Sequence, residues 1–241
     1  MIYKYNDCTG LTSITIPEGV TSIGEETFSG CSSLTSITIP ESVTSIDWHA
    51  FSGCSSLTSI IVESGNTVYD SRNDCNAIIE TATNTLIAGC QNTIIPNSVT
   101  NIGYYAFSGC SSLTSITIPE SVTSIGGYAF RDCSGLTNVY CLAEDIPTTT
   151  SYVFENTKIS SATLHVPAAS LRKYQETAPW SGFGTIVGLT EDEIDAVEDV
   201  LAAGEDTEIA RYDLQGRKIA KQKGINIIRY SDGTSKKVLV K

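Results

Sequence analysis

Apolar and polar residues alternate along this chain in a pattern that returns every 23 residues. The segment FSGCSSLTSITIPESVTSI, residues 28–46, recurs unchanged as residues 107–125. Five cysteines keep the same spacing within two groups: Cys8, Cys31 and Cys54, then Cys110 and Cys133. The step of 56 positions from Cys54 to Cys110 equals 23 plus 33, so one central unit carries about ten extra residues. A fixed period of this kind indicates stacked repeat units, each packing on its neighbours.

Each unit predicts one main strand and a short second side. Ile37 and Ile39 alternate with Thr38 as in a half-buried strand. Pro40 ends that strand, because proline has no N–H to donate to a continuing ladder. Val43 and Ile46 then point back inside, and a second apolar column follows in the next turns at Phe51, Phe107 and Phe130. We therefore predict a mainly β repeat solenoid with coils of about 23 residues.

The segment 28–46 resembles the motif F-x-x-C-x-x-L-T-S-I-T-I-P-x-x-V-T-x-I-G of the BspA-type leucine-rich repeats of bacterial surface proteins. The resemblance covers roughly residues 5–145, and several of its columns recur in phase. It implies a leucine-rich repeat solenoid and a role in adhesion or host interaction rather than catalysis. It also implies an extracellular or cell-surface location, and it does not identify the ligand.

The long central unit contains CNAIIETATNTLIAGC, residues 75–90, which predicts a β-hairpin around the polar turn 81–84. Folding the segment about that turn places Ile78 opposite Ile87 and Cys75 opposite Cys90. A cross-strand disulfide between these cysteines is one outcome, and a pair of buried thiols is the other. The remaining cysteines recur with the period, so we expect them to be buried free thiols that pack as small hydrophobes.

The period fails from residue 146 onward. Residues 146–188 predict a C-terminal cap with a short helix over 168–177, in which Leu171 and Tyr174 share a face. Trp180 and Phe183 can close the exposed end of the stack. We therefore divide the chain into a capped solenoid, residues 1–188, and a second part, residues 189–241.

The second part changes charge along its length. Residues 191–208 hold nine acidic residues and no basic ones, which suits either a linker or a short helix. Residues 211–241 hold nine basic and two acidic residues and predict short strands separated by glycine-containing turns. The segments YDLQGR, residues 212–217, and KVLVK, residues 237–241, resemble C-terminal sorting domains of Bacteroidetes-type secretion. A small β-module without a sorting role is the alternative.

Composition and charge exclude several classes of protein. Hydrophobic residues make up 41% of the chain, which is enough to bury a core. The net charge of −12 argues against nucleic-acid partners, because phosphate binding needs clustered Lys and Arg. No run approaches the roughly 18 apolar residues of a membrane helix. The start, MIYKYNDCTG, lacks a signal-peptide core and begins inside a repeat, so we expect further residues to precede Met1.

The sequence predicts no enzyme, cofactor or metal site. His49 and His165 stand in unrelated repeat positions, and G-x-S-x-G and glycine-rich phosphate loops are absent. Zinc ligation is not expected either, because the chain has no C-x-x-C and no nearby histidine pair.

Repeated positions become rows on the surface of a stacked protein, and two rows are candidate ligand-binding sites. The outward position of the main strand holds Thr15, Thr38, Ile61, Ile94, Thr117 and Tyr140. A second row precedes the Phe column and includes Trp48, Tyr104, Tyr105 and Tyr128, whose flat rings suit a sugar or a peptide. Structural roles remain open for both, since β-branched residues favour strands and the aromatics can cover the outer turn. A third row, Glu18, Glu41 and Glu120, can be a cation site or a solvated edge.

The main functional hypothesis is non-catalytic recognition of a host or matrix protein or a glycan. The alternative is a structural spacer that displays another module and has no ligand of its own. A third reading, a flat Ser/Thr array for ice or mineral, is weakened because Ile61, Ile94 and Tyr140 interrupt it. The oligomeric state cannot be read from the sequence.

Overall fold

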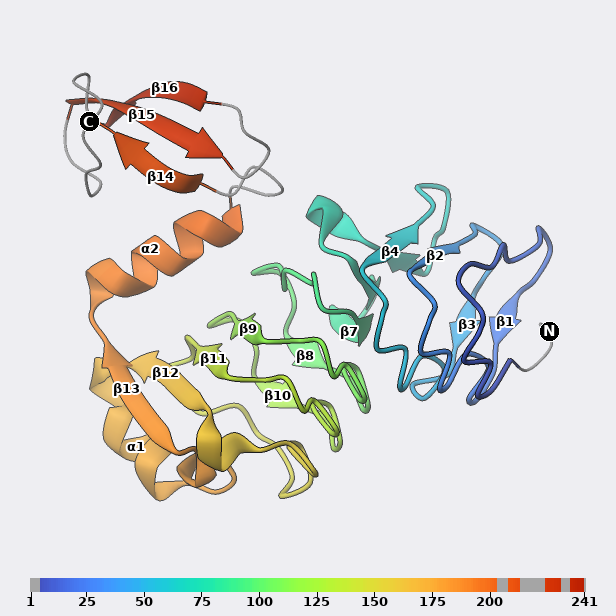
Figure 1. Ribbon diagram of the computed structural model, residues 1–241, viewed down its shortest axis with the longest axis horizontal. Coiled ribbons are helices and arrows are strands. Elements are labelled where there is room, and N and C mark those ends of the chain that lie inside the picture. The colour runs from blue at the N-terminus through green and yellow to red at the C-terminus, as the bar shows by residue number, and fades with distance from the viewer. Residues whose placement is uncertain (1–4, 203–207, 213–223, 231–234, 241) are drawn as a thin grey trace. The chain divides into compact units, whose positions relative to one another are not determined.

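The computed structural model describes residues 5–202, 208–212, 224–230 and 235–240. The chain forms two compact units, Met1–Glu191 and Asp192–Lys241. In the first unit the repeats lie side by side in chain order, from the N-terminal strands to β13 (Figure 1). None of the helices in the described ranges combines the length and the apolar character needed to cross a membrane.

The main strands of the repeats pair in parallel. They are β2 (Ser36–Ile39), β4 (Ser59–Val62), β9 (Ser115–Ile118), β11 (Asn138–Cys141), β12 (Thr163–Pro167) and β13 (Thr185–Leu189). They form two sheets, β2–β4 and β9–β11–β12–β13. Ile37 lies beside Ile60 and Ile116 beside Val139, so each apolar residue meets its counterpart in the next repeat. This register explains why the repeats are alike, because identical side chains pack on one another.

The short second side of the repeats also forms parallel pairs. Its strands are β1 (Ser22–Ile23), β3 (Ser45–Ile46), β8 (Asn101–Ile102) and β10 (Ser124–Ile125). β1 pairs with β3, whereas β8 and β10 belong to a five-stranded sheet in the order β10–β8–β7–β6–β5. The predicted short side is therefore present, and the central insertion joins it.

The insertion supplies β5 (Tyr69–Asp70), β6 (Ala77–Glu80) and β7 (Thr85–Gly89), with a 3-10 turn η1 (Arg72–Asp74) between β5 and β6. β6 and β7 form the predicted hairpin about residues 81–84. The predicted pairing of Ile78 with Ile87 is wrong, because Ile78 faces Ala88. A register shift after Ile78 moves the pairing on, so that Ile79 faces Leu86 and Ile87 is left between the pairs.

Cys75 and Cys90 are free thiols and not a disulfide. The Sγ of Cys75 lies 3.9 Å from Ala77 O, and the Sγ of Cys90 lies 3.5 Å from Asn76 O. The two side chains also pack in different hydrophobic clusters of the first unit. The other predicted thiols are buried as well, apart from Cys8, which is exposed.

The phenylalanine column is the centre of the core. Phe107, Phe130 and Phe154 stack with ring centroids 5.1 and 5.6 Å apart, and Phe28 stacks on Phe51 at 5.4 Å. The outer turn that carries this column continues across the insertion, because Gly53 N–H donates to Ser108 O at 2.8 Å. The same bond recurs in the next turn, where Gly109 N–H donates to Arg131 O. The turns therefore stack without interruption although the chain between them is longer.

Apolar side chains are buried at the C-terminal end of the stack. It contains the short 3-10 helices η2 (Ile159–Ser161), η3 (Ala168–Ser170) and η4 (Trp180–Gly182) and the helix α1 (Leu171–Glu176). Tyr174 and Trp180 are fully buried, and Trp180 contacts the ring of Phe154 edge-on at 5.6 Å. The hydroxyl of Tyr174 donates to Ala143 O at 2.8 Å, which anchors α1 to the last repeat.

The second unit contains a helix and an antiparallel sheet. α2 (Glu191–Ala202) shows that the acidic stretch begins as a helix. The strands β14 (Glu208–Tyr212), β15 (Gly224–Tyr230) and β16 (Ser235–Val240) pair in that order, which confirms the predicted short strands. Of the two segments that resemble a sorting domain, residues 213–217 and 241 lie outside the described residues.

Candidate functional site

Four of the sequence-predicted aromatic residues lie together on the outer turns, in contact with one another. Trp48 stacks on Tyr105 at 5.2 Å, and Tyr105 stacks on Tyr128 at 4.9 Å. Tyr104 meets Trp48 edge-on at 5.9 Å. Tyr152 continues the stack at 5.5 Å from Tyr128, although it lies outside the 23-residue spacing. We call these five residues the aromatic row.

The aromatic row presents ring surface to solvent. Three of these residues keep about half of their surface exposed to solvent: Trp48 (51%), Tyr104 (53%) and Tyr152 (54%). Tyr105 and Tyr128 are half-buried between their neighbours. Exposed aromatic residues that are held by other rings lose little conformational freedom when a ligand binds, which favours recognition.

The backbone that carries the row is unusual. Tyr105 and Tyr128 have φ angles of +57° and +61°, in the left-handed region where bulky residues are rare. Glu26, at the equivalent position of an earlier repeat, has φ +56°. Glycine or asparagine would adopt this conformation at lower cost. The row therefore retains tyrosines where the backbone alone would favour smaller residues.

Charged groups lie near both ends of the row, beside Tyr128 and beside Tyr105. The guanidinium of Arg131 lies 5.7 Å from the centre of the Tyr128 ring, and it pairs with Glu155 at 3.3 Å. Partial loss of solvent, and then the Glu155 carboxylate, raise the pKa of Tyr128, so its phenol remains a hydrogen-bond donor at neutral pH. At the other end, His49 Nδ1 lies 3.9 Å from Glu26 Oε1, and its ring lies 4.2 Å from Tyr105.

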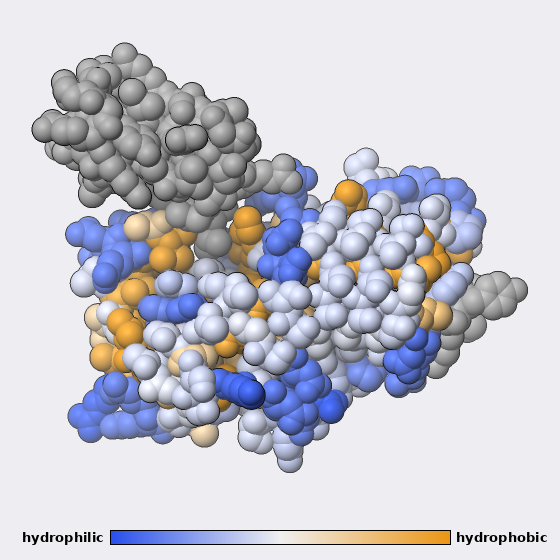
Figure 2. Space-filling model, viewed as in Figure 1, coloured by the Kyte–Doolittle hydropathy of each residue, from blue (hydrophilic) through white to orange (hydrophobic). Residues whose placement is uncertain are grey.

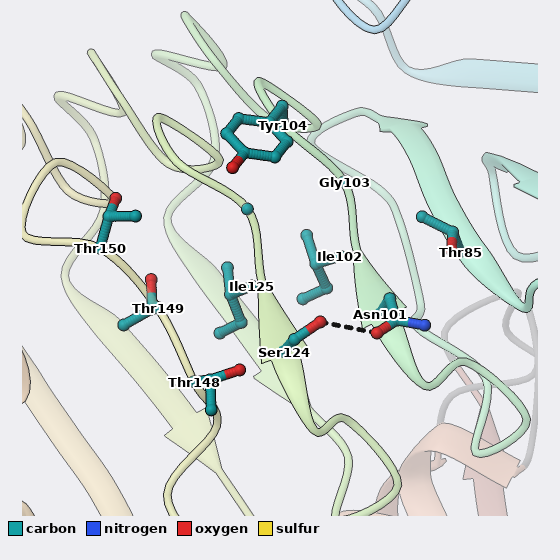
Figure 3. Close-up of a pocket in the computed structure, with 11 residues that line it drawn as sticks. Thr85, Asn101, Ile102, Gly103, Tyr104, Ser124, Ile125, Thr148, Thr149 and Thr150 are labelled. Atoms are coloured by element: carbon teal, nitrogen blue, oxygen red, sulfur yellow. Dashed lines mark hydrogen bonds between the residues drawn. The ribbon is translucent and has the colours of Figure 1, made fainter.

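An open groove of about 440 Å³ begins at Tyr104 (Figure 3). Its lining consists of Thr85, Asn101, Ile102, Gly103, Tyr104, Ser124, Ile125, Gly126 and residues 148–150. Gly103 and Gly126 let neighbouring turns approach closely beside the groove, because a side chain at Gly126 would run into the backbone of Tyr104. The groove thus connects the aromatic row to the short strands β8 and β10.

One side of the groove is a ladder of polar side chains. Thr85 is the register partner of Asn101, Asn101 of Ser124, and Ser124 of Thr148. Ser124 Oγ donates to Asn101 Oδ1 at 2.6 Å, as the dashed line in Figure 3 shows. Neighbouring strands lie about 4.8 Å apart, so the ladder offers one polar group per strand at that interval.

The other predicted site residues are not brought together in this way. Ile61 is exposed in β4 next to Thr38, whereas Ile94 is half-buried in an irregular segment and donates its N–H to Cys75 O. The two isoleucines therefore do not continue one paired strand row. Tyr140 stacks on His165 at 4.2 Å with nearly parallel rings, so one face of Tyr140 is covered.

Two features of the surface could not have been found from the repeat alone. Tyr152 follows Tyr128 by 24 residues instead of 23, and the one-residue slip removes it from the column. The groove residues Asn101, Ser124 and Thr148 belong to the same repeat position as Ser22 and Ser45, so no local signal distinguishes them. Only their place beside Tyr104 and the two glycines makes a groove.

The buried thiols offer no reactive site. Burial raises the pKa of Cys54 and of Cys133 to about 12, and that of Cys75 and of Cys141 to about 11. Thiols of this kind stay protonated at neutral pH and are poor nucleophiles and poor metal ligands. No group of His, Cys, Asp and Glu suited to holding a metal occurs among the residues described.

The chain is similar to several solved structures, whereas the curated proteins give no match. No curated protein matches the chain at a significant level. Among solved structures, the chain is similar to a leucine rich cell surface protein from Faecalibacterium prausnitzii (25% identity, TM-score 0.48, 79% of this chain and 63% of that one). It is also similar to the pneumococcal vaccine antigen PcpA (14% identity, TM-score 0.43, 74% and 68%). A leucine rich repeat protein from T. pallidum matches at 20% identity (TM-score 0.37, 75% and 71%).

The chain thus spans less than two thirds of the F. prausnitzii protein. A family model gives the stronger result. Six copies of the BspA type leucine rich repeat region match residues 2–76 and 77–175, which together are most of the chain. The chain belongs to the family of BspA type leucine rich repeat proteins.

Proposed function

We propose that the chain is a non-catalytic recognition protein of the bacterial surface, with the aromatic row as its ligand-binding face. The observation that carries this proposal is that Trp48 and Tyr104 stay about half exposed while other rings hold them in place. The Phe column already fills the core beneath them. Flat, fixed and half-exposed rings are typical of surfaces that bind sugars or other flat ligands.

The architecture that supports this role is a solenoid of about 23-residue coils with one hairpin-bearing coil and a cap over 146–188. Residues 189–241 then form a separate linker and β-module, which serves as a sorting signal for export. The 23-residue register of the strands supports the solenoid, and the separate compact unit that begins at Asp192 supports the separate module.

The proposal is tested by binding to an array that carries neutral glycans, acidic glycans, fibronectin, laminin and collagen. The wild-type chain is compared with the Trp48→Ala/Tyr104→Ala/Tyr105→Ala variant. The Ile61→Ala/Ile94→Ala variant is the matched control, because it also removes apolar surface but from the other candidate row. Circular dichroism establishes that both variants keep the native thermal transition.

Binding that is lost in the aromatic variant and kept in the isoleucine variant supports the aromatic row. Loss only in the isoleucine variant assigns recognition to the main strands instead. If the wild-type chain binds nothing on the array, the proposal is wrong, and the alternative of a structural spacer gains the support.

A further inference from the structure

We infer that the groove between Tyr104 and the polar ladder of β8 and β10 binds a neutral glycan. This inference rests on the proposed function and assigns its ligand class and its polar contacts. The ladder consists of Thr85, Asn101, Ser124 and Thr148. Tyr104 links it to the aromatic row, so ring stacking and hydrogen bonding are available at adjoining places.

The groove has no charged side chain in its lining. Its lining contains threonine, serine, asparagine, isoleucine, glycine and tyrosine, and none of these is ionised at neutral pH. The chain as a whole has a net charge of −12, which repels polyanions at long range. The surface in Figure 2 is mostly of intermediate hydropathy, with the hydrophilic residues gathered in separate patches. An uncharged ligand therefore fits the groove better than an acidic glycan.

The hydroxyls of the groove have hydrogen-bonding capacity that a ligand can use. Each hydroxyl can donate once and accept twice, as the hydroxyls of a sugar also do. Thr148 Oγ1 uses its hydrogen for Thr123 O at 3.2 Å and keeps acceptor capacity. Thr149 Oγ1, also in the lining, is buried and finds no partner among the described residues. A buried hydroxyl without a partner requires an explanation, and a bound hydroxyl or water supplies one.

The groove lacks the features that peptide ligands need. Peptides that add to a sheet need an unpaired strand edge. β8 is paired on both sides, with β7 and with β10, and β10 continues to Thr148 through Ser124. Peptides that insert side chains need open apolar pockets, but Ile102 and Ile125 are almost fully buried. The groove offers neither, so its exposed features are hydroxyls, an amide and one ring.

The spacing of the polar ladder suits an extended glycan. Polar groups recur along the ladder at the strand spacing of about 4.8 Å, which is comparable with the length of one pyranose unit in an extended glycan. Gly103 and Gly126 line the space between the ladder and Tyr104 with backbone alone, and a Cβ at Gly126 would meet the backbone of Tyr104. The volume of about 440 Å³ lies in the range of small-ligand sites. A short stretch of a linear glycan can therefore contact the ladder and the ring of Tyr104 together.

The test uses the same array with the full chain and three variants. Ser124→Ala/Thr148→Val removes two ladder hydroxyls while Thr148→Val keeps the branched shape. Tyr104→Ala removes the ring. Ser22→Ala/Ser45→Ala is the matched control, because these serines hold the equivalent repeat position in β1 and β3, outside the groove. Thermal unfolding by circular dichroism identifies any variant that has lost its fold.

The expected result is binding of the wild-type chain to at least one neutral glycan. Ser124→Ala/Thr148→Val and Tyr104→Ala should each weaken that binding by about fivefold or more, which is the loss of one or two hydrogen bonds or one stacking contact. Ser22→Ala/Ser45→Ala should bind as the wild type does.

Two results would overturn the inference and leave the proposed function intact. One is binding only to acidic glycans or to fibronectin, laminin or collagen. The other is neutral-glycan binding that folded Ser124→Ala/Thr148→Val retains in full. Failure of the wild-type chain to bind any probe would overturn both the inference and the proposed function.

Discussion

Trp48 stacks on Tyr105 at 5.2 Å although 57 positions separate residues 48 and 105 in the chain. The contact exists because the outer turns on either side of the insertion are bonded directly, through Gly53 N–H and Ser108 O. The extra residues of the central unit form β5, β6 and β7, which join the sheet of β8 and β10 and leave the bond between the outer turns in place. The aromatic row is therefore assembled from repeats that the sequence places far apart.

The two tryptophans should respond differently to the same substitution. Trp48→Ala should lower the free energy of unfolding by no more than about 1 kcal/mol, because half of the residue is already exposed. Trp180→Ala should cost about 3–5 kcal/mol, since it leaves a cavity among Phe154, Tyr174 and Phe183. Urea unfolding followed by circular dichroism measures both. Equal losses would contradict the assignment of Trp180 to the cap core.

The glycine that approaches the Phe column should not tolerate a methyl group. A Cβ at Gly89 would overlap the ring of Phe107, so Gly89→Ala should destabilise the fold by about 1–3 kcal/mol through overpacking. Gly10→Ala is the matched control, because a Cβ there meets no atom within 4 Å. The thermal midpoints of the two variants make the comparison. A Gly89→Ala protein as stable as the wild type would refute the close packing of β7 on Phe107.

Buried thiols should make the fold sensitive to alkali. Burial raises the pKa of Cys54 from 9.0 to about 12, so the folded chain keeps this proton above pH 9 while the unfolded chain releases it. The unfolded state then binds fewer protons, and stability falls as pH rises from about 9 towards 12. The loss is about 1 kcal/mol per pH unit for each such thiol. Below pH 9 the effect is absent.

This dependence is measured by urea unfolding under reducing conditions at pH 7.5, 9.0 and 10.5. Cys54→Ala should show a shallower decline than the wild type, whereas Cys8→Ala should match the wild type because Cys8 is exposed. The comparison between variants removes the contribution of other groups that titrate in this range. An identical slope for all three proteins would show that the Cys54 thiol does not cause the decline.

Alkylation should show eight free cysteines. Without reductant, iodoacetamide should label only Cys8 rapidly in the native chain and all eight cysteines after denaturation, because seven are buried in the fold. Mass spectrometry counts the labels. Six labels after denaturation, with Cys75 and Cys90 unmodified, would instead establish a disulfide in the hairpin.

Deletion of residues 205–241 should leave the repeats folded. The first compact unit ends at Glu191, so we expect its core to fold without the strands β14–β16. The truncated chain should keep the thermal midpoint and the far-ultraviolet spectrum of the repeat unit. A large loss of thermal stability would refute the division into two independent parts.

The repeat made most of the fold predictable. Ile37, Ile60 and Phe107 recur in phase, and their spacing alone indicates parallel strands and a stacked aromatic core. The hairpin was predictable from its polar turn, but its register was not. The shift at Ile78 depends on how β7 packs on neighbouring repeats, which no local pattern encodes.

The candidate site was predictable only in part. The aromatic residues stand out because Trp48 and Tyr104 interrupt a row of small and polar residues. Their contacts depend on a bond between turns that lie on either side of the insertion, so the sequence could not show that Trp48 meets Tyr105. The groove is a still weaker signal, since it arises from two glycines and from ordinary serines and threonines.

The bond between Gly53 and Ser108 has an evolutionary consequence. It allows the chain to gain or lose residues between β4 and β8 while Trp48 and Tyr105 stay in contact. Selection can therefore act on the length of the central unit and on the composition of the aromatic row as two independent characters. Relatives that differ in their hairpins can keep the same aromatic row, and relatives with the same hairpin can change it.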